Sequence, residues 1–186
     1  MKRYAPQSGF SLIELLVAAS IFSFVVTGVT GLFMQALDMQ RRASGIQKIQ
    51  ENAQYTLESV TREVRVSRVV SGNTGDCNPG NAATQTMTLD HPVNGTVVYE
   101  YDRSGGIGVI RRSSSVAGSV TEPITSTDVD ITKFAFCVSG SGPDGTQARV
   151  TIPMTLESRS GRASTRVSVS VQSTIISRDV TEDLLQ

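Results

Sequence analysis

The chain has 186 residues, with 17 basic and 17 acidic side chains and therefore no formal net charge. This length suits one modest domain plus an anchor, and the absence of a basic block leaves no footprint for binding nucleic acid. Tryptophan is absent, and Gly, Ser, Thr and Val are plentiful, which suits an exported, strand-rich domain.

The N-terminus combines a short basic leader with a long apolar run. Residues 1–8 lead to Gly9, Phe10 follows, and Glu14 is the only charge between Leu12 and Met34. This segment is long enough to span a bilayer as a helix. A charge at the centre of such a helix costs about 2.5–3.5 kcal/mol on insertion scales, so Glu14 calls for a partner.

The order of leader, glycine, phenylalanine, glutamate and apolar helix resembles the class III signal of type IV prepilins and type II secretion pseudopilins, over about residues 8–35. The resemblance implies that a prepilin peptidase cuts between Gly9 and Phe10 and methylates the new N-terminal amine of Phe10. It also implies that Glu14 pairs with the N-terminal amine of a neighbouring pilin or pseudopilin subunit. The implied location is a single-pass inner-membrane protein with an exported head, and then a pilus or periplasmic pseudopilus.

Two simpler interpretations of the N-terminus compete with this one. An ordinary secretory signal places its cleavage site after the apolar core, whereas here the apolar run follows Gly9. A plain single-pass anchor, oriented by Lys2 and Arg3, is the stronger alternative. It leaves Glu14 unexplained.

Beyond the membrane segment, a narrow apolar stripe at three- and four-residue steps continues the helix. We expect one helix from about Ser11 to Val70, ended by the turn-forming residues 71–75. The stripe is a coiled-coil seam or packs on the chain's own sheet, and the strand-rich segment that follows favours the sheet. Its members are Ala36, Met39, Ala43, Ile46, Ala53, Leu57, Val60 and Val64, with Gln50 at the one polar position.

After Gly75 the apolar pattern changes to a period near two. We expect an α+β fold: a long N-terminal helix whose outer half packs on an antiparallel sheet, or two sheets, in the pilin-like architecture that the resemblance also implies. Pro153 suggests that its strand is an edge strand or carries a bulge. The predicted strands cover 84–89, 96–101, 107–111, 130–138, 150–156 and 167–175, with a tight turn at 103–106.

An exported head would bring Cys77 and Cys137 into an oxidising compartment, where an even count favours a disulfide. Closing a loop of about 60 residues would stabilise the fold by roughly 4 kcal/mol in the chain-entropy model. Two free or separately buried thiols are the alternative. Because two distant cysteines and the single His91 make no coordinating cluster, we expect neither a metal nor another cofactor.

The sequence holds none of the common catalytic motifs, such as G-x-S-x-G, a P-loop, C-x-x-C or H-E-x-x-H, so we expect no enzyme. His91 precedes a proline and is expected in a turn. Asp128 and Asp130 are a candidate calcium pair, although a solvated strand edge is the favoured interpretation. Arg103 with Arg111-Arg112 is a candidate basic patch for DNA, with a solvated rim favoured.

These observations predict a leader over residues 1–9, a transmembrane and assembly helix over 10–35, its amphipathic continuation over 36–72 and an exported β-rich head over 73–186. The predicted function is a structural minor subunit of a type IV pilus or type II secretion pseudopilus. The C-terminal strand pattern resembles the minor pilins of the W type and the minor pseudopilins of the J type. The alternative is a membrane-anchored adhesin or DNA-binding module that uses a pilin-like anchor.

Overall fold

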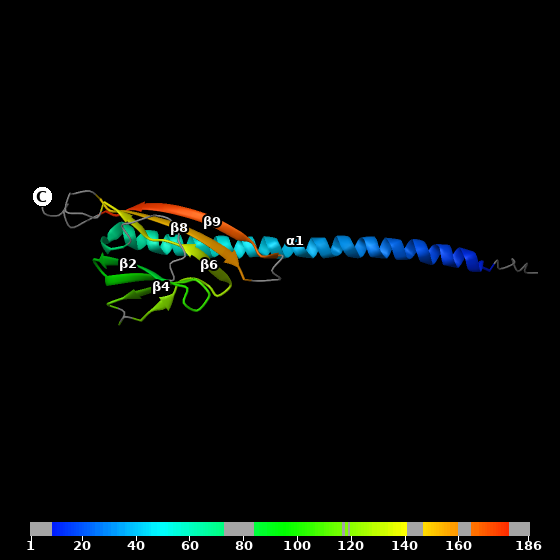
Figure 1. Ribbon diagram of the computed structural model, residues 1–186, viewed down its shortest axis with the longest axis horizontal. Helices are drawn as coiled ribbons and strands as arrows, with labels where there is room; N and C mark the ends of the chain where they lie inside the picture. Colours follow the sequence, from blue (N-terminus) through cyan, green and yellow to red (C-terminus); the bar gives the residue numbers. More distant parts are fainter. Residues whose placement is uncertain are drawn as a thin grey trace, which may run out of the picture. The chain divides into compact units, whose positions relative to one another are not determined.

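The computed structural model describes residues 9–72, 84–116, 118, 120–140, 147–159 and 165–178. The chain divides into two compact units, Met1–Arg41 and Arg42–Gln186. One long N-terminal helix followed by antiparallel strands confirms the predicted α+β class (Figure 1). The elements are α1 (Leu12–Val66), β1 (Arg68–Ser71), β2 (Thr84–His91), β3 (Gly95–Asp102), β4 (Val109–Ser114), β5 (Glu122–Pro123), β6 (Val129–Phe134), β7 (Cys137–Ser139), β8 (Arg149–Ser158) and β9 (Ser168–Ile176).

In the first unit, the described residues are the inner part of α1 and the three residues before it, Gly9, Phe10 and Ser11. Nearly all of their apolar side chains are exposed. The helix is long and apolar enough to cross a membrane. Its hydroxyl groups bond back to the helix itself, at 2.8 Å from the carbonyl oxygens of the preceding turn. Such bonds satisfy polar side chains where water is absent. The four hydroxyl donors are Ser20, Ser23, Thr27 and Thr30.

In the second unit, the outer part of α1 buries one line of side chains. Ala53, Val60 and Val64 confirm the predicted stripe. It is wrong at its start, where Met39, Ala43 and Ile46 are exposed. The buried line steps mostly by four residues, so it passes through Ile49 instead of Gln50. The buried helix residues are Gly45, Ile49, Ala53, Thr56, Val60 and Val64.

The helix ends at Val66, so the prediction that it continues to Val70 is wrong. Residues Arg68–Ser71 form β1, which pairs with β2 so that Arg68 faces Asp90. Valines are common in strands because their branched side chains pack well on a pleated surface. Pairing with β2 therefore makes residues 68–71 a strand, which the local sequence pattern did not predict.

The first sheet has the order β1-β2-β3-β4-β5, with every neighbouring pair antiparallel. The predicted turn at 103–106 is confirmed: the Gly106 amide donates to the Arg103 carbonyl at 3.0 Å, and Gly106 has a positive φ of 81°. The strand after this turn begins at Val109 and ends at Ser114, two to three residues later than predicted. The two short strands β1 and β5 were not predicted.

The second sheet has β8 at its centre, with β6 and β7 along one side and β9 along the other. The predicted strand 130–138 is therefore two strands with a break at Ala135 and Phe136. Pro153 lies in this central strand, so the edge-strand interpretation is wrong. Its carbonyl accepts a hydrogen bond from Ala135 in that break, and its missing N–H faces the same side.

One hydrophobic core joins the outer part of α1 to both sheets. At its centre, Phe134 stacks on Tyr101 at 5.1 Å between ring centroids and meets Phe136 edge-on at 4.5 Å. Tyr101 belongs to the first sheet and Phe134 to the second, so aromatic packing holds the sheets together.

Candidate processing and assembly site

The first turn of α1 is closed by a hydrogen bond between Ser11 and Glu14. Ser11 precedes the first helical residue, and its amide donates to Glu14 Oε2 at 3.4 Å. The Leu15 amide donates to the Ser11 carbonyl at 3.2 Å. The Ser-x-x-Glu spacing is that of a capping box, which sequence reasoning missed although the spacing marks it. Glu14 thus sits among the unpaired amides of a helix N-terminus, which favour a negative charge.

Gly9 and Phe10 precede this turn, and neither is packed against other described residues. A Cβ atom added at Gly9 would meet nothing within 4 Å, and Phe10 is 86% exposed. The fold of this chain therefore gives no reason for a glycine at residue 9 or for a bulky apolar side chain at residue 10.

The predicted cysteine pair falls partly outside the described residues. Cys137 begins β7 and is buried, whereas Cys77 lies outside the part of the chain that the structure describes. The disulfide therefore stays a prediction.

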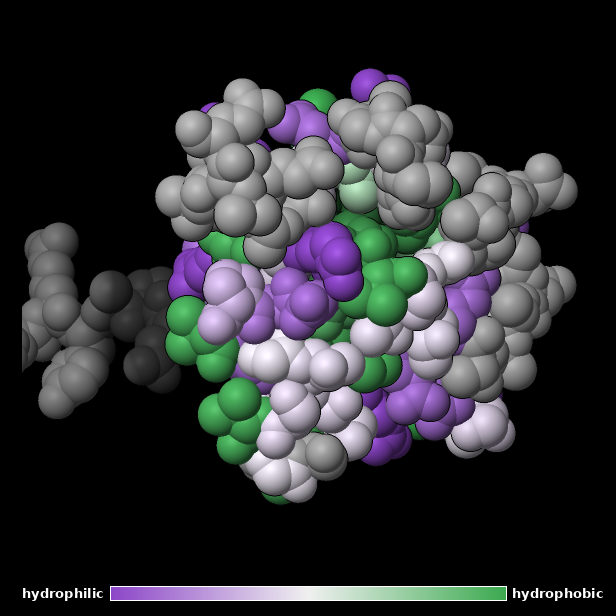
Figure 2. Space-filling view, turned by 90° about the vertical axis from the view of Figure 1, so that its left-hand side faces the viewer, coloured by the Kyte–Doolittle hydropathy of each residue, from purple (hydrophilic) through white to green (hydrophobic). Residues whose placement is uncertain are grey.

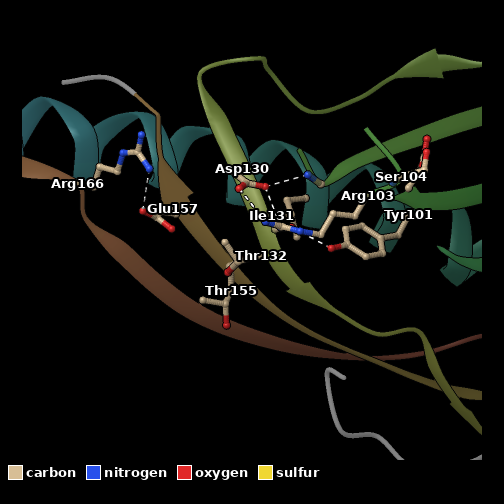
Figure 3. Close-up of polar contacts among 11 residues, drawn as sticks. Tyr101, Arg103, Ser104, Asp130, Ile131, Thr132, Thr155, Glu157 and Arg166 are labelled. Atoms are coloured by element: carbon tan, nitrogen blue, oxygen red, sulfur yellow. Dashed lines mark hydrogen bonds and ion pairs between the residues drawn. The ribbon is translucent and has the colours of Figure 1, made fainter. Parts of the chain in front are cut away.

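The two aspartates of the candidate calcium pair contact different partners. Asp130 accepts two hydrogen bonds from Arg103, at 2.9 and 3.1 Å, and a third from the Gly108 amide at 2.8 Å (Figure 3). Asp128 faces Lys48 on α1, with 3.1 Å between Nζ and Oδ2. Within the described residues, no cluster of His, Cys, Asp and Glu could hold a metal ion.

Asp130 and Arg103 instead form a latch between the two sheets. Arg103 also donates to the Ile131 carbonyl at 2.7 Å, and the Tyr101 hydroxyl donates to the same oxygen at 2.9 Å. Figure 3 shows these groups converging from the turn after β3 onto β6. Burial raises the pKa of Tyr101, so this hydroxyl stays a donor at neutral pH.

We expect Gly108→Ala to destabilise the second unit by about 1–3 kcal/mol, the usual cost of overpacking. A Cβ at Gly108 would collide with the Ile131 carbonyl, which the latch holds in place. Gly105→Ala is the matched control, because a Cβ there meets nothing within 4 Å. Thermal melting of both variants checks this expectation, and equal melting temperatures would contradict it.

Two arginines of the candidate basic patch form ion pairs with carboxylates of this chain. Arg112 contacts Glu63 on α1, with Nε at 3.0 and 3.1 Å from the two carboxylate oxygens. The Tyr99 hydroxyl donates to the same carboxylate at 2.6 Å. With Arg103 bound to Asp130, two of the three arginines are neutralised by partners, which leaves the DNA-binding interpretation without support.

The Glu63 carboxylate is held ionised by this arrangement. Burial is the largest single effect and would raise the pKa of Glu63. The hydrogen bonds from Arg112 and Tyr99 and the positive charge of Arg112 together outweigh it, so the pKa is lowered from its usual value. No sequence signal marked this contact, since Glu63 and Arg112 are 49 residues apart.

His91 is the turn residue that was predicted. Its Nδ1 accepts hydrogen bonds from the amides of Val93 and Asn94, at 3.1 and 3.0 Å, and so closes the turn between β2 and β3. These hydrogen bonds give His91 a structural role in the turn.

Comparison with known proteins finds one match, at the N-terminus. Residues 5–30 match the family model described as the prokaryotic N-terminal methylation motif. No curated protein and no solved structure matches the chain. The matched residues include Gly9, Phe10 and Glu14, and the motif is of a structural, pilin type. Together with the exposed apolar helix, the match fits a membrane-anchored protein. The chain carries a prepilin-type N-terminal methylation signal, which is typical of type IV pilin-like proteins.

Proposed function

We propose that the chain is a structural minor subunit of a type IV pilus or a type II secretion pseudopilus. The observation that carries this proposal is the methylation motif at residues 5–30, which includes the exposed apolar first part of α1. The open surroundings of Gly9 suit cleavage by a prepilin peptidase between Gly9 and Phe10. The N-methylated amine of Phe10 would then be the new start of the chain.

Glu14 supplies the charge for assembly in this proposal. Before cleavage, its contact is the Ser11 amide of its own helix. In a filament core, the amine of a neighbouring subunit would replace part of that contact with a full opposite charge. A charge pair in apolar surroundings is far stronger than one in water, and leaving either charge alone there is costly. Correct register between subunits follows from both effects.

A minor rather than a major role, of the W or J type, rests on the regular C-terminal strand pattern. β9 alternates exposed residues, among them Ser170, Gln172 and Thr174, with the half-buried Val169 and Val171 and the buried Ile175. Both types of system share the signal and the helix, so either a pilus or a pseudopilus would use this chain in the same way.

Mass spectrometry of the N-terminal peptide tests the proposal, with sheared filaments compared with the membrane fraction. We expect a peptide that begins at N-methylated Phe10. Its presence in filaments supports a pilus role, and its restriction to membranes supports a pseudopilus. An intact Met1, or a cut elsewhere, would overturn the proposed processing.

A further inference from the structure

We propose that the turn between β2 and β3 is an acid-sensitive switch, which is closed while His91 is neutral and opens once His91 is protonated. Histidine is the side chain whose ordinary titration falls between pH 5 and 8, and His91 is the single histidine of this chain. The turn follows the end of β2, at the left in Figure 1. Figure 2 views this end of the second unit, where hydrophobic and hydrophilic side chains lie side by side. The switch would operate whether or not the chain forms filaments.

The closed turn depends on one lone pair of the neutral imidazole. His91 Nδ1 accepts hydrogen bonds from the backbone amides of Val93 and Asn94, at 3.1 and 3.0 Å. A neutral imidazole has one nitrogen that accepts and one that carries a hydrogen, so the hydrogen here belongs on Nε2. A second proton can therefore bind only at Nδ1, on the lone pair that the two amides share. Both amides then lose their acceptor, and a new N–H group faces them.

The turn between β3 and β4 uses the same kind of contact with a different acceptor. The Asp102 carboxylate accepts from the Ser104 amide, two residues further on, at 2.8 Å. Asn, Asp, Ser and Thr are the side chains that usually make this contact. Hydrogen bonds from Ser104 lower the pKa of Asp102, so this carboxylate remains an acceptor from pH 8 to pH 5. With a histidine in the corresponding position, the β2–β3 turn has an acceptor that titrates in that range.

The carboxylates near His91 have arginine partners of their own. Glu63 on α1 is close enough for its charge to act on His91, and it is bound to Arg112 on β4. On β1, Arg68 lies 3.9 Å from the carboxylate of Asp90, the residue before His91. Because each carboxylate faces an arginine, its attraction for a protonated His91 is reduced. The two hydrogen bonds to Nδ1 then remain the main link between the proton and the conformation of the turn.

Opening changes the turn and leaves the strands behind it paired. Asn94 Nδ2 donates to Glu63 Oε1 at 3.4 Å, a contact to α1 that an open turn would lose. Val93 in the same turn is 75% exposed, so its place on the surface changes as well. Behind the turn, Thr96 and Ser115 exchange hydrogen bonds at 3.0 and 2.9 Å, which do not involve His91. The switch thus couples pH to the surface at this end of the second unit without unfolding the sheet.

Nuclear magnetic resonance of the untagged full chain in detergent, from pH 8 to pH 5, tests the switch. His91 gives the single imidazole signal, so its titration is followed directly. At pH 8 we expect the imidazole hydrogen on Nε2. As the pH falls, the amide signals of Val93 and Asn94 should shift along the titration curve of His91, while the Ser104 amide signal stays constant. A hydrogen on Nδ1 at pH 8, or unchanged Val93 and Asn94 amides while His91 titrates, would overturn the proposal.

His91→Asn is the matched control, because asparagine Oδ1 is attached to Cγ as histidine Nδ1 is and accepts hydrogen bonds throughout this pH range. His91→Ala has no acceptor at any pH. Deuterium exchange of the Val93 and Asn94 amides is compared among the three chains at one pH at a time, so the intrinsic pH dependence of exchange cancels. At pH 8 we expect the parent chain to exchange as slowly as His91→Asn. At pH 5 it should exchange as fast as His91→Ala, about tenfold faster than His91→Asn.

A parent chain that exchanges like one of the two variants at both pH values would contradict the switch. If the asparagine does not protect the two amides at pH 8, the comparison with His91→Ala decides alone: the parent chain has to be slower at pH 8 and equal at pH 5. The Ser104 amide should exchange equally in all three chains at each pH. A change at Ser104 as large as the change at Val93 would mean that the whole sheet opens, which is not the proposed event.

Discussion

Glu14→Gln is expected to prevent incorporation of the chain into filaments while the processed protein stays in the membrane. Glutamine at this position keeps the Ser-x-x-Gln form of the capping box but removes the charge. An amine buried in the filament core would then lack its counter-charge. Breaking a buried ion pair costs about 3–5 kcal/mol, or on the order of 10²–10³-fold in the association constant. Quantification of the chain in sheared filaments measures the effect.

Two further variants separate the charge from the cap. Ser11→Ala removes the hydroxyl of the Ser-x-x-Glu capping sequence and keeps both the charge and the Ser11 amide contact, so its loss should stay within the roughly 1 kcal/mol of a helix cap. Glu14→Ala removes both charge and cap and should fail at least as completely as Glu14→Gln. Normal incorporation of Glu14→Gln would refute the charge-pair role and return Glu14 to capping alone.

The parts of the fold that sequence predicted are those with a local signal. The apolar run and Ser11 mark the start of α1, and the alternation of valine with serine marks β9 and its inner face. Gly9, Phe10 and Glu14 are likewise local, since the motif that contains them is one stretch of chain. The motif match at residues 5–30 rests on the same stretch.

The features that sequence missed depend on contacts between distant residues. Arg68–Ser71 becomes a strand because β2 pairs with it, and Pro153 fits a central strand because β6 and β7 break opposite it. The charges of Arg103 and Arg112 meet Asp130 and Glu63, which are 27 and 49 residues away. No local pattern distinguishes such partnered charges from a solvated rim.

Arg112→Met is expected to destabilise the second unit by about 2–4 kcal/mol at pH 7, because it leaves the Glu63 carboxylate buried without its cation. The Glu63 side chain is only 12% exposed. Arg62→Met is the matched control, since Arg62 pairs with Glu58 at 2.7 Å on the surface of the same helix, with side chains 75% and 70% exposed. Exposed pairs of this kind contribute about 0.3–0.5 kcal/mol.

The pH dependence of this difference identifies its electrostatic origin. The pKa of Glu63 is lowered below 4.5 in the folded chain, so the stability that its ionised form contributes is complete above pH 4.5. That contribution is lost as the pH falls through the folded pKa. In Arg112→Met, Glu63 is still buried, which favours its protonated form. Acidification therefore removes the cost of the buried charge in the variant, while it lowers the free energy of unfolding of the parent chain. Urea unfolding of the detergent-solubilised chains, followed by circular dichroism, should show the two stabilities converging below pH 4.5. A difference that stays constant from pH 7 to below pH 4 would mean that Arg112 stabilises the head through its packing instead of its charge.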